Sequence, residues 1–247
     1  MEVILTIAGS DSGAGAGIQQ DLKTVTALGH YCATVVTAVT AQNTMGVLGV
    51  MPVGKDMLAA QLRAVLSDYA IGAIKIGMIP NKECAEAIVE ALHDVVCPVV
   101  CDPVMISTSG TQLMSDDCIE YVSEALFPLC TLVTPNIPEA ERLCLPHGVK
   151  GRYSVLLKGG HADGSDMTDI LITAEGEKHT FTSPRIETTN LHGTGCTLSS
   201  AIATYLAEGK SLSDAVRFGK DVINRGINGG KDLHIGKGNG PLWLGKV

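Results

Sequence analysis

The stretch VILTIAGSDSGAGAGIQQDLKTVTAL (Val3–Leu28) joins three patterns in a row. An uninterrupted apolar run, Val3–Ala8, ends in the small-residue loop GSDSGAGAG (Gly9–Gly17), and Ile18–Leu28 then has helical spacing. The order predicts a strand, a loop and a helix. Because the loop carries only small residues where the helix begins, its backbone N–H groups can approach a bound anion. A plain tight turn is the alternative interpretation of the same loop.

The same alternation continues along the chain. Apolar runs predict strands near Cys32–Val39, Ala73–Gly77, Val99–Cys101, Thr131–Thr134 and Val155–Lys158, and helical patterns fall near Met57–Tyr69, Lys82–His93 and Asp116–Leu126. Strands without polar alternation that are separated by helices favour a largely parallel sheet buried on both faces. We therefore expect a three-layer α/β fold, with any site at the carboxyl edge of the sheet.

Two β-rich pieces and two final helices complete the pattern. The β-rich pieces are Met45–Val53 and the predicted hairpin of Thr168–Thr173 with Lys178–Thr182. Helices are expected near Thr194–Glu208 and Leu212–Asn228. Since no linker, charge run or internal repeat divides the sequence, we expect residues 1–247 to form a single domain.

Composition excludes several classes of function. The 247 residues are 45% apolar and 18% charged, and 18 basic against 26 acidic residues give a net charge of −8, which disfavours nucleic acid as a partner. No apolar run is long enough to span a bilayer. The N-terminus is predicted to be a strand rather than a signal peptide. The eight cysteines are scattered without metal-ligand spacing, so we expect mostly small core residues in a cytoplasmic, reducing compartment.

Two glycine-rich matches are interpreted as accidental. The loop contains Gly13, Gly15 and Gly17 but lacks the spacing of a dinucleotide fingerprint. GVMPVGKD (Gly49–Asp56) nearly matches a phosphate-binding P-loop, but Asp56 occupies the position of the magnesium-binding hydroxyl. The sequence therefore predicts neither a dinucleotide-binding loop nor a P-loop at these positions.

A more specific motif is HGTGC (His192–Cys196), directly before an apolar helix. Gly193, Thr194 and Gly195 lie where successive backbone N–H groups can point at one anion, and the helix dipole adds positive potential. This arrangement suits a phosphoryl group or an oxyanion, and it predicts a lowered pKa for the Cys196 thiol. A glycine turn before a helix with a buried cysteine is the alternative, and the role of His192 stays open.

Polar residues also follow three strand ends. Asp102 lies in CDPVM, Asn136 and Glu139 lie in TPNIPEAE, and Lys158 lies in KGGH. Carboxylates at the edge of a sheet suit Mg²⁺, which keeps most of its waters, and a lysine offers a point charge to phosphate. Each segment has a structural alternative: a helix cap for Asn136 and Glu139, and a surface turn for Lys158.

The combination resembles a known family. GSDSGAGAGIQQDLK, VVTAVTAQNT, KIGM, DPVM, TPNIPEAE, KGGH, HGTGCTLSSAIA and GKGNGP occur in the order seen in hydroxymethylpyrimidine/phosphomethylpyrimidine kinases of thiamine biosynthesis, members of the ribokinase-like superfamily. The resemblance runs nearly end to end. It implies a ribokinase-like fold and ATP- and Mg²⁺-dependent phosphorylation of 4-amino-5-hydroxymethyl-2-methylpyrimidine, then of its monophosphate. It also implies a homodimer.

The resemblance assigns roles to individual residues. It implies that Gln42 bonds the aminopyrimidine, with Asp21, Gly9, Met78 and Val104 lining the same pocket. Other residues would act on phosphate and metal: Asp102 and Glu139 toward Mg²⁺, Asn136, Lys158 and Thr194 toward phosphates, and Gly193, Gly195 and Cys196 in the catalytic anion hole. Cys196 stands where most of the superfamily has an aspartate base. The adenine pocket is expected near the C-terminal helices and GKGNG.

The chain departs from the family pattern in two places, and rival functions remain. Gly13-Ala14 replaces a commoner Ser-Gly, and the segment between Glu141 and Lys158 is short, which leaves the covering of the nucleotide edge open. A pyridoxal kinase of the same fold is the nearest rival. A hydrolase with Cys196 as nucleophile and His192 or His161 as base is a second. A nonenzymatic pyrimidine sensor is a third.

Overall fold

The computed structural model describes residues 1–107, 110–143, 145, 152–159 and 166–245. The strands are β1 (Val3–Asp11), β2 (Tyr31–Asn43), β3 (Gly46–Pro52), β4 (Ile71–Ile76), β5 (Val99–Cys101), β6 (Leu132–Val133), β7 (Ser154–Leu157), β8 (Asp166–Ile172) and β9 (Lys178–Pro184). The α-helices are α1 (Gly17–Ala27), α2 (Lys55–Asp68), α3 (Lys82–Leu92), α4 (Asp116–Tyr121), α5 (Ile137–Arg142), α6 (Thr194–Ala207) and α7 (Leu212–Gly230). A π-helical turn, Val122–Leu126, extends α4.

The described strands form one sheet in the order β3-β2-β1-β4-β5-β6-β7-β8-β9. From β2 to β7 every neighbouring pair is parallel, whereas β3, β8 and β9 join in antiparallel pairs. The expected hairpin and the mostly parallel sheet are confirmed. Because the first crossover leads from β1 to β2 on one side and the next to β4 on the other, the switch point lies beside β1, where α/β folds form their ligand crevice.

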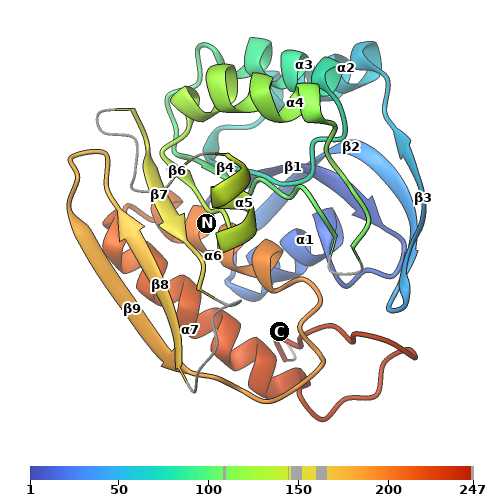
Figure 1. Ribbon diagram of the computed structural model, residues 1–247. Helices are drawn as coiled ribbons and strands as arrows, with labels where there is room; N and C mark the ends of the chain where they lie inside the picture. The colour runs from blue at the N-terminus through green and yellow to red at the C-terminus, as the bar shows by residue number, and fades with distance from the viewer. Residues whose placement is uncertain (108–109, 144, 146–151, 160–165, 246–247) are drawn as a thin grey trace.

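Helices cover both faces of the sheet and give the three expected layers (Figure 1). One core lies between the sheet and α2, α3 and α4, and includes Leu58, Ile88 and Phe127. The second lies under α1, α6 and α7, with Leu198 and Val216 at its centre. In each core, apolar residues of adjacent strands pack against the apolar faces of the covering helices. The strands are therefore buried on both faces, which explains their uninterrupted apolar runs.

The near-match to a P-loop is indeed accidental. Gly49–Pro52 belong to the exposed edge strand β3, and Gly54 caps α2 with Asp56 in its first turn. A P-loop instead follows a buried strand. The short segment between Glu141 and Lys158 and the candidate base His161 fall wholly or partly outside the described residues. No described helix has the length and hydropathy needed to cross a membrane.

The strand ends bring distant parts of the sequence to one edge. Backbone N–H groups just beyond the strands continue the ladder, from Gly77 to Ile7 O, from Asp102 to Ile76 O and from Lys158 to Pro135 O. Asn136 and Lys158 form a parallel bridge next to each other. The carboxyl ends of β1, β2, β4, β5, β6 and β7 therefore form the rim of the candidate site.

Candidate active site

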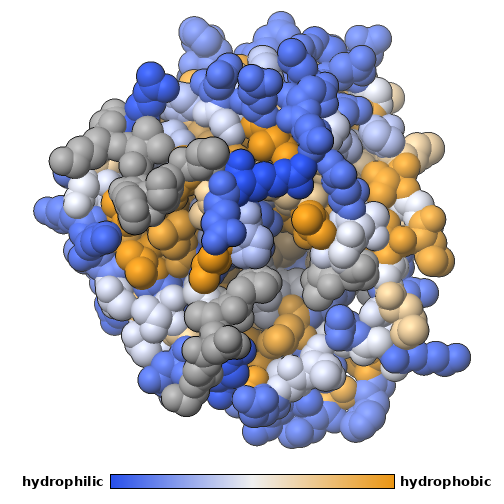
Figure 2. Space-filling model, in the orientation of Figure 1, coloured by the Kyte–Doolittle hydropathy of each residue, from blue (hydrophilic) through white to orange (hydrophobic). Residues whose placement is uncertain are grey.

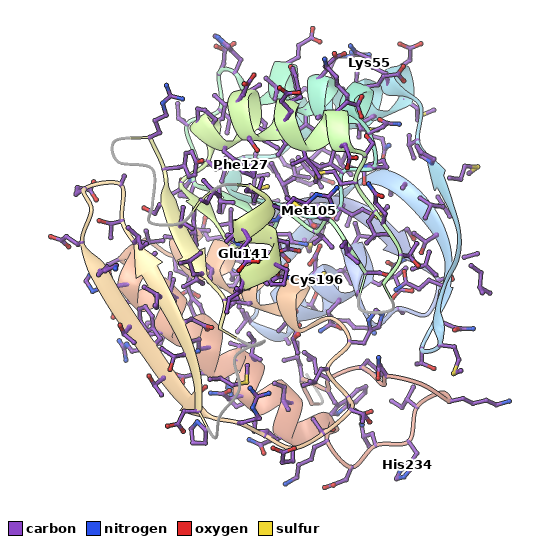
Figure 3. All side chains as sticks on the ribbon, viewed as in Figure 1. Lys55, Met105, Phe127, Glu141, Cys196 and His234 are labelled. Carbon is purple, nitrogen blue, oxygen red and sulfur yellow. The ribbon has the colours of Figure 1, made fainter. Side chains whose placement is uncertain are left out.

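The HGTGC turn is built around two glycines, of which Gly193 has no room for a side chain and Gly195 has little. Gly193 caps α6 with φ +87°, and a Cβ there would lie 1.9 Å from the carbonyl oxygen of Gly15. A Cβ on Gly195 would lie 3.1 Å from Asp102 Oδ2 and 3.6 Å from Lys158 Nζ. The start of α6 thus touches the first loop on one side and the charged strand ends on the other. In Figure 3 Cys196 lies near the centre of the view, where α6 begins beside α5.

Asp11 organises the first loop and ties it to this turn. Its carboxylate accepts the N–H groups of Gly13, Gly15 and Ala16 at 2.8–3.0 Å and the His192 ring at 3.0 Å. Burial would raise the pKa of Asp11, but the hydrogen bonds from His192 and the loop amides outweigh it and leave the pKa lowered. His192 is therefore placed as a link between the loop and the helix.

The expected lowering of the Cys196 pKa is wrong. Burial raises the pKa of the thiol to about 11, with Asp21 and Asp102 adding to the shift, while the charge of Lys75 and the N–H of Gly17 oppose it. The helix terminus favours a thiolate, but loss of hydration costs more at this depth. The thiol is consequently neutral at pH 7.

Asp102, Lys158 and Glu139 form one charged cluster, as the strand ends predicted. Lys158 Nζ donates to Asp102 Oδ1 at 2.6 Å, and Thr134 Oγ1 donates to the same oxygen at 3.1 Å. Burial raises the pKa of Glu139; Lys158 counteracts this and Asp102 adds to it. Two carboxylates and one ammonium leave a net negative charge beside the start of α6.

Asn136 and Glu139 also form the helix cap that was the structural alternative for this segment. The Asn136 side chain accepts the Glu139 N–H at 2.9 Å, and Glu139 Oε2 accepts the Asn136 N–H at 2.8 Å, which closes a capping box on α5. The cap occupies Glu139 Oε2 and the Asn136 carbonyl, and it holds both side chains next to Lys158. Capping and a role at the site are thus compatible. At the opposing turn, the Thr194 N–H donates to Leu191 O at 3.3 Å, so the amides of Gly195 and Cys196 form the open end of the helix.

Asp21 is sealed in the interior rather than presented to a pocket. Both its oxygens accept from Lys75 Nζ, at 2.8 and 2.9 Å, and they also accept from Thr6 and Ser200 hydroxyls. The Lys75 and Asp21 side chains are both 0% exposed. The expectation that Asp21 contacts the pyrimidine is therefore not supported by its surroundings. Lys75 was missed, although a lysine inside the apolar run IGAIKIGM is the signal that could have found it.

The other residues that the resemblance assigned to the pyrimidine pocket lie at or just after the carboxyl ends of β1, β2, β4 and β5. A Cβ on Gly9 would come within 2.9 Å of the Met78 sulfur, so these two residues are in contact, and Val104 follows β5 on the same rim. Gln42, at the end of β2, is half-buried; its amide lies 3.3 Å from His192 Nε2 and accepts from Thr40 Oγ1 at 3.2 Å. Both contacts are long, so a ligand can replace them.

Gln42 lines a concavity together with residues from four separate segments. The other lining residues are Asn43, Thr44, Gly46, Ser107, His192 and Asn239. Asn239 belongs to GKGNG, which the resemblance assigned to the adenine pocket. In the structure Asn239 lines this concavity with Gln42, because the chain after α7 returns to the turn of the β2–β3 hairpin, where the Asn239 N–H donates to Thr44 O (Figure 1).

Fold and site together define a class of protein. A helix N-terminus that faces a lysine and two carboxylates, at the switch point of a parallel sheet and beside a small pocket, is the equipment of a small-molecule phosphotransferase. Comparison with known protein families gives the same class of protein. Residues 11–243 match the model of the phosphomethylpyrimidine kinase family, and the chain belongs to that family.

Individual relatives support the same family. The hydroxymethylpyrimidine/phosphomethylpyrimidine kinase of Rhizobium meliloti is 43% identical, over 97% of this chain and 96% of the relative. The thiamine biosynthesis bifunctional protein ThiED of Geobacter sulfurreducens is 46% identical over 97% of this chain, which spans about half (51%) of that protein. Among solved structures, an ADP complex of Bacillus subtilis pyridoxal kinase has a TM-score of 0.88 at 30% identity, and covers 99% of this chain and 97% of that one.

Proposed function

We propose that the chain transfers the γ-phosphoryl group of ATP first to 4-amino-5-hydroxymethyl-2-methylpyrimidine and then to its monophosphate. The observation that carries the proposal is the convergence of the α6 N-terminus with Lys158 and Asp102, because the missing side chain at Gly195 lets the start of the helix lie close to the ammonium and the carboxylate. A transferring phosphoryl group carries its negative charge on equatorial oxygens. Preorganised donors of this kind stabilise such charge without reorganisation.

The acceptor would be held at the other end of the same rim. Gln42 would exchange its two long contacts for the amino group and ring nitrogen of the pyrimidine, since an amide both donates and accepts. Met78, against Gly9, and Val104 would pack on the ring. This position directs the hydroxymethyl group toward Cys196 and leaves the charged cluster for the nucleotide.

The charged cluster fits Mg²⁺ held largely through water. The described residues contain no group of three or more metal-ligating side chains, and Asp102 is already bonded to Lys158. Asp102 and Glu139 would therefore accept from the ion's water shell. Burial, with Asp102 adding to it, raises the pKa of Glu139, and a bound cation would favour its carboxylate form. When bound with ATP, the ion neutralises the developing phosphate charge. Lys158, Asn136 and Thr194 would contact phosphate oxygens.

Cys196 is proposed as the base for the first transfer only. The hydroxymethyl oxygen attacks the γ-phosphorus, the bond to the ADP oxygen breaks, and the alcohol proton passes to the Cys196 sulfur. With a thiol pKa of about 11, the small thiolate fraction at neutral pH limits this contribution. The monophosphate needs no such base, because its second pKa near 6 leaves it mostly dianionic.

We infer that the chain is a single domain that assembles as a homodimer. The exposed apolar side chains of the edge strand β3 and its hairpin support the dimer. Apolar side chains at the β2–β3 hairpin are exposed, among them Met45, Leu48 and Met51 at 64–80%, and Figure 2 shows apolar residues gathered over β3. A second copy would cover this face, whereas a monomer rarely leaves such a patch open. Sedimentation of the parent and of Leu48→Asp tests the assembly: the parent should sediment as a dimer and the variant as a monomer.

A parallel assay with three acceptors tests the function. The protein, ATP and Mg²⁺ are incubated with the hydroxymethylpyrimidine, its monophosphate or pyridoxal, and ADP release and phosphorylated product are both quantified. We expect both pyrimidines to be phosphorylated with the higher kcat/KM. Pyridoxal as the better acceptor would establish the rival kinase, whose activity is the one named for the structurally similar Bacillus subtilis enzyme. Conversion of any of the three compounds in the absence of ATP would establish a hydrolase.

A further inference from the structure

The C-terminal segment Gly236–Gly240 is hydrogen-bonded to a single residue, Thr44, in the turn of the β2–β3 hairpin. The Thr44 hydroxyl accepts the N–H groups of Lys237 and Gly238 at 3.1 and 3.2 Å, and its carbonyl oxygen accepts the Asn239 N–H at 3.0 Å. Three backbone amides in succession thus bond to one residue 193–195 positions earlier in the chain. The segment is held as a fixed wall.

Close packing confirms that this contact is tight. A Cβ on Gly236 would lie 2.2 Å from Thr44 Oγ1, and one on Gly238 would lie 2.2 Å from Thr44 O. At the far end of the segment, the His192 N–H donates to Gly240 O at 3.1 Å. The wall therefore connects the hairpin that carries Gln42 to the turn that leads into Cys196.

Asn239, in this wall, lines the concavity that Gln42 and His192 also line. Its backbone N–H donates to Thr44 O, and within the described part of the chain no hydrogen bond of its side-chain amide is found. An amide with free donor and acceptor groups can read the polar edge of a heterocycle in the same way as Gln42. Asn239 differs from Gln42 in belonging to the C-terminal segment, far from β2 in the sequence.

We propose that Asn239 is a substrate-binding residue and that Thr44 is the positioning residue that sets it. The ligand is the aminopyrimidine, so the inference rests on the proposed function and extends its recognition surface to the C-terminal segment. The segment belongs to the acceptor pocket and not to the adenine pocket.

Four variants test the assignment: Asn239→Ala removes the amide, Thr44→Val removes the hydroxyl that anchors the wall, Gly238→Ala displaces the wall, and His234→Ala is the control. His234 lies two residues before the segment and away from the site (Figure 3), and its ring contacts Asp232 O. The readouts are the Kd of the hydroxymethylpyrimidine by calorimetry, the KM values of pyrimidine and ATP, and the melting temperature.

We expect the pyrimidine Kd and KM to rise about three- to tenfold in Asn239→Ala and Thr44→Val, and at least as much in Gly238→Ala. The KM of ATP should stay within about twofold, and His234→Ala should match the parent. An ATP KM that rises while pyrimidine binding holds would assign the segment to the nucleotide. Unchanged binding of both ligands in folded variants would equally overturn the proposal. A parent protein that neither binds nor phosphorylates the pyrimidine would instead refute the proposed function.

Discussion

Two lysine–aspartate pairs lie under the same sheet edge, and they differ in what surrounds them. Lys75 and Asp21 are both 0% exposed, and Asp21 also accepts from Thr6 and Ser200. In the other pair, Asp102 is 2% exposed but Lys158 is 17% exposed, and the pair lies against Gly195 at the start of α6. A buried pair with all its partners fixed can hold elements together, whereas only a pair with an open side can exchange partners with a ligand.

The difference separates scaffold from chemistry within one site. The sealed pair joins β4 to α1, and through the hydroxyls of Thr6 and Ser200 it also joins β1 and α6. Ser200 lies one helical turn beyond Cys196, so the pair fixes the start of α6 from below. The open pair lies beyond that start, facing the phosphate position. Variants of each pair test this division of roles.

The largest effect is expected from breaking the sealed pair. Lys75→Met leaves the Asp21 carboxylate buried without its counter-charge and should lower the free energy of unfolding by about 3–5 kcal/mol. Denaturant unfolding measures this. Lys55→Met is the matched control, because the Lys55–Glu86 pair is exposed to solvent and its loss should change the free energy of unfolding far less. Equal losses in both variants would contradict the distinction. Lys75→Met combined with Asp21→Asn should recover part of the stability.

Cys196→Ala should slow the two transfers unequally. The first phosphorylation loses a base and should fall about 10²-fold, the lower part of the range for proton transfer, because the thiolate is scarce. The second should change little. Because the thiol pKa is raised to about 11, the thiolate fraction grows as pH rises from 7 toward 11, so the parent's first-step rate should increase with pH while the variant's should not. Quenched-flow rates across this range give the answer, and equal losses in both steps would remove Cys196 as the base.

The open pair should also determine the magnesium requirement. Asp102→Asn weakens acceptance from the water shell of the ion, and we expect the Mg²⁺ concentration for half-maximal rate to rise about ten- to hundredfold. Titration of the initial rate measures it. Asp56→Asn, on the exposed first turn of α2, is the control and should titrate like the parent. An unchanged titration for Asp102→Asn would exclude the carboxylate from the metal's surroundings.

The smallest effect concerns the first loop. Ala14 has φ +57° and is, among the described residues, the non-glycine residue found in the left-handed region. Ala14→Gly should raise the free energy of unfolding by about 0.5–1 kcal/mol, since relief of strain exceeds the added freedom of the unfolded chain. Ala16→Gly, where φ is −140°, should give no gain. A destabilised Ala14→Gly would show that the loop is not strained.

Much of the fold and part of the site follow from the sequence because they depend on local patterns. Uninterrupted apolar runs located β1, β4 and β5, and parallel strand ends predicted that Asp102 and Lys158 would meet. Pairings between distant segments could not be predicted this way. Lys75 meets Asp21 across 54 positions, and no local pattern indicates that contact or the contact of Thr44 with Asn239.

The prediction of a lowered pKa for Cys196 was wrong for a related reason. A position in the first helical turn is a local feature and favours the thiolate, but the depth of burial is a property of the assembled layers. Where two effects oppose each other at one atom, the sequence reveals only the local one. The same holds for Asp21, whose motif predicted a pocket and whose environment is a sealed core.

The most direct test of the account is the single-turnover rate of phosphoryl transfer, per folded molecule, in Lys158→Met and Lys75→Met. The account predicts that Lys158→Met transfers the phosphoryl group of ATP to the hydroxymethylpyrimidine at least about 10²-fold more slowly than the parent, with a smaller loss of stability than Lys75→Met. It also predicts that the fraction of Lys75→Met that remains folded loses less of its transfer rate than Lys158→Met. A Lys158→Met protein that transfers phosphate at the parental rate would contradict it.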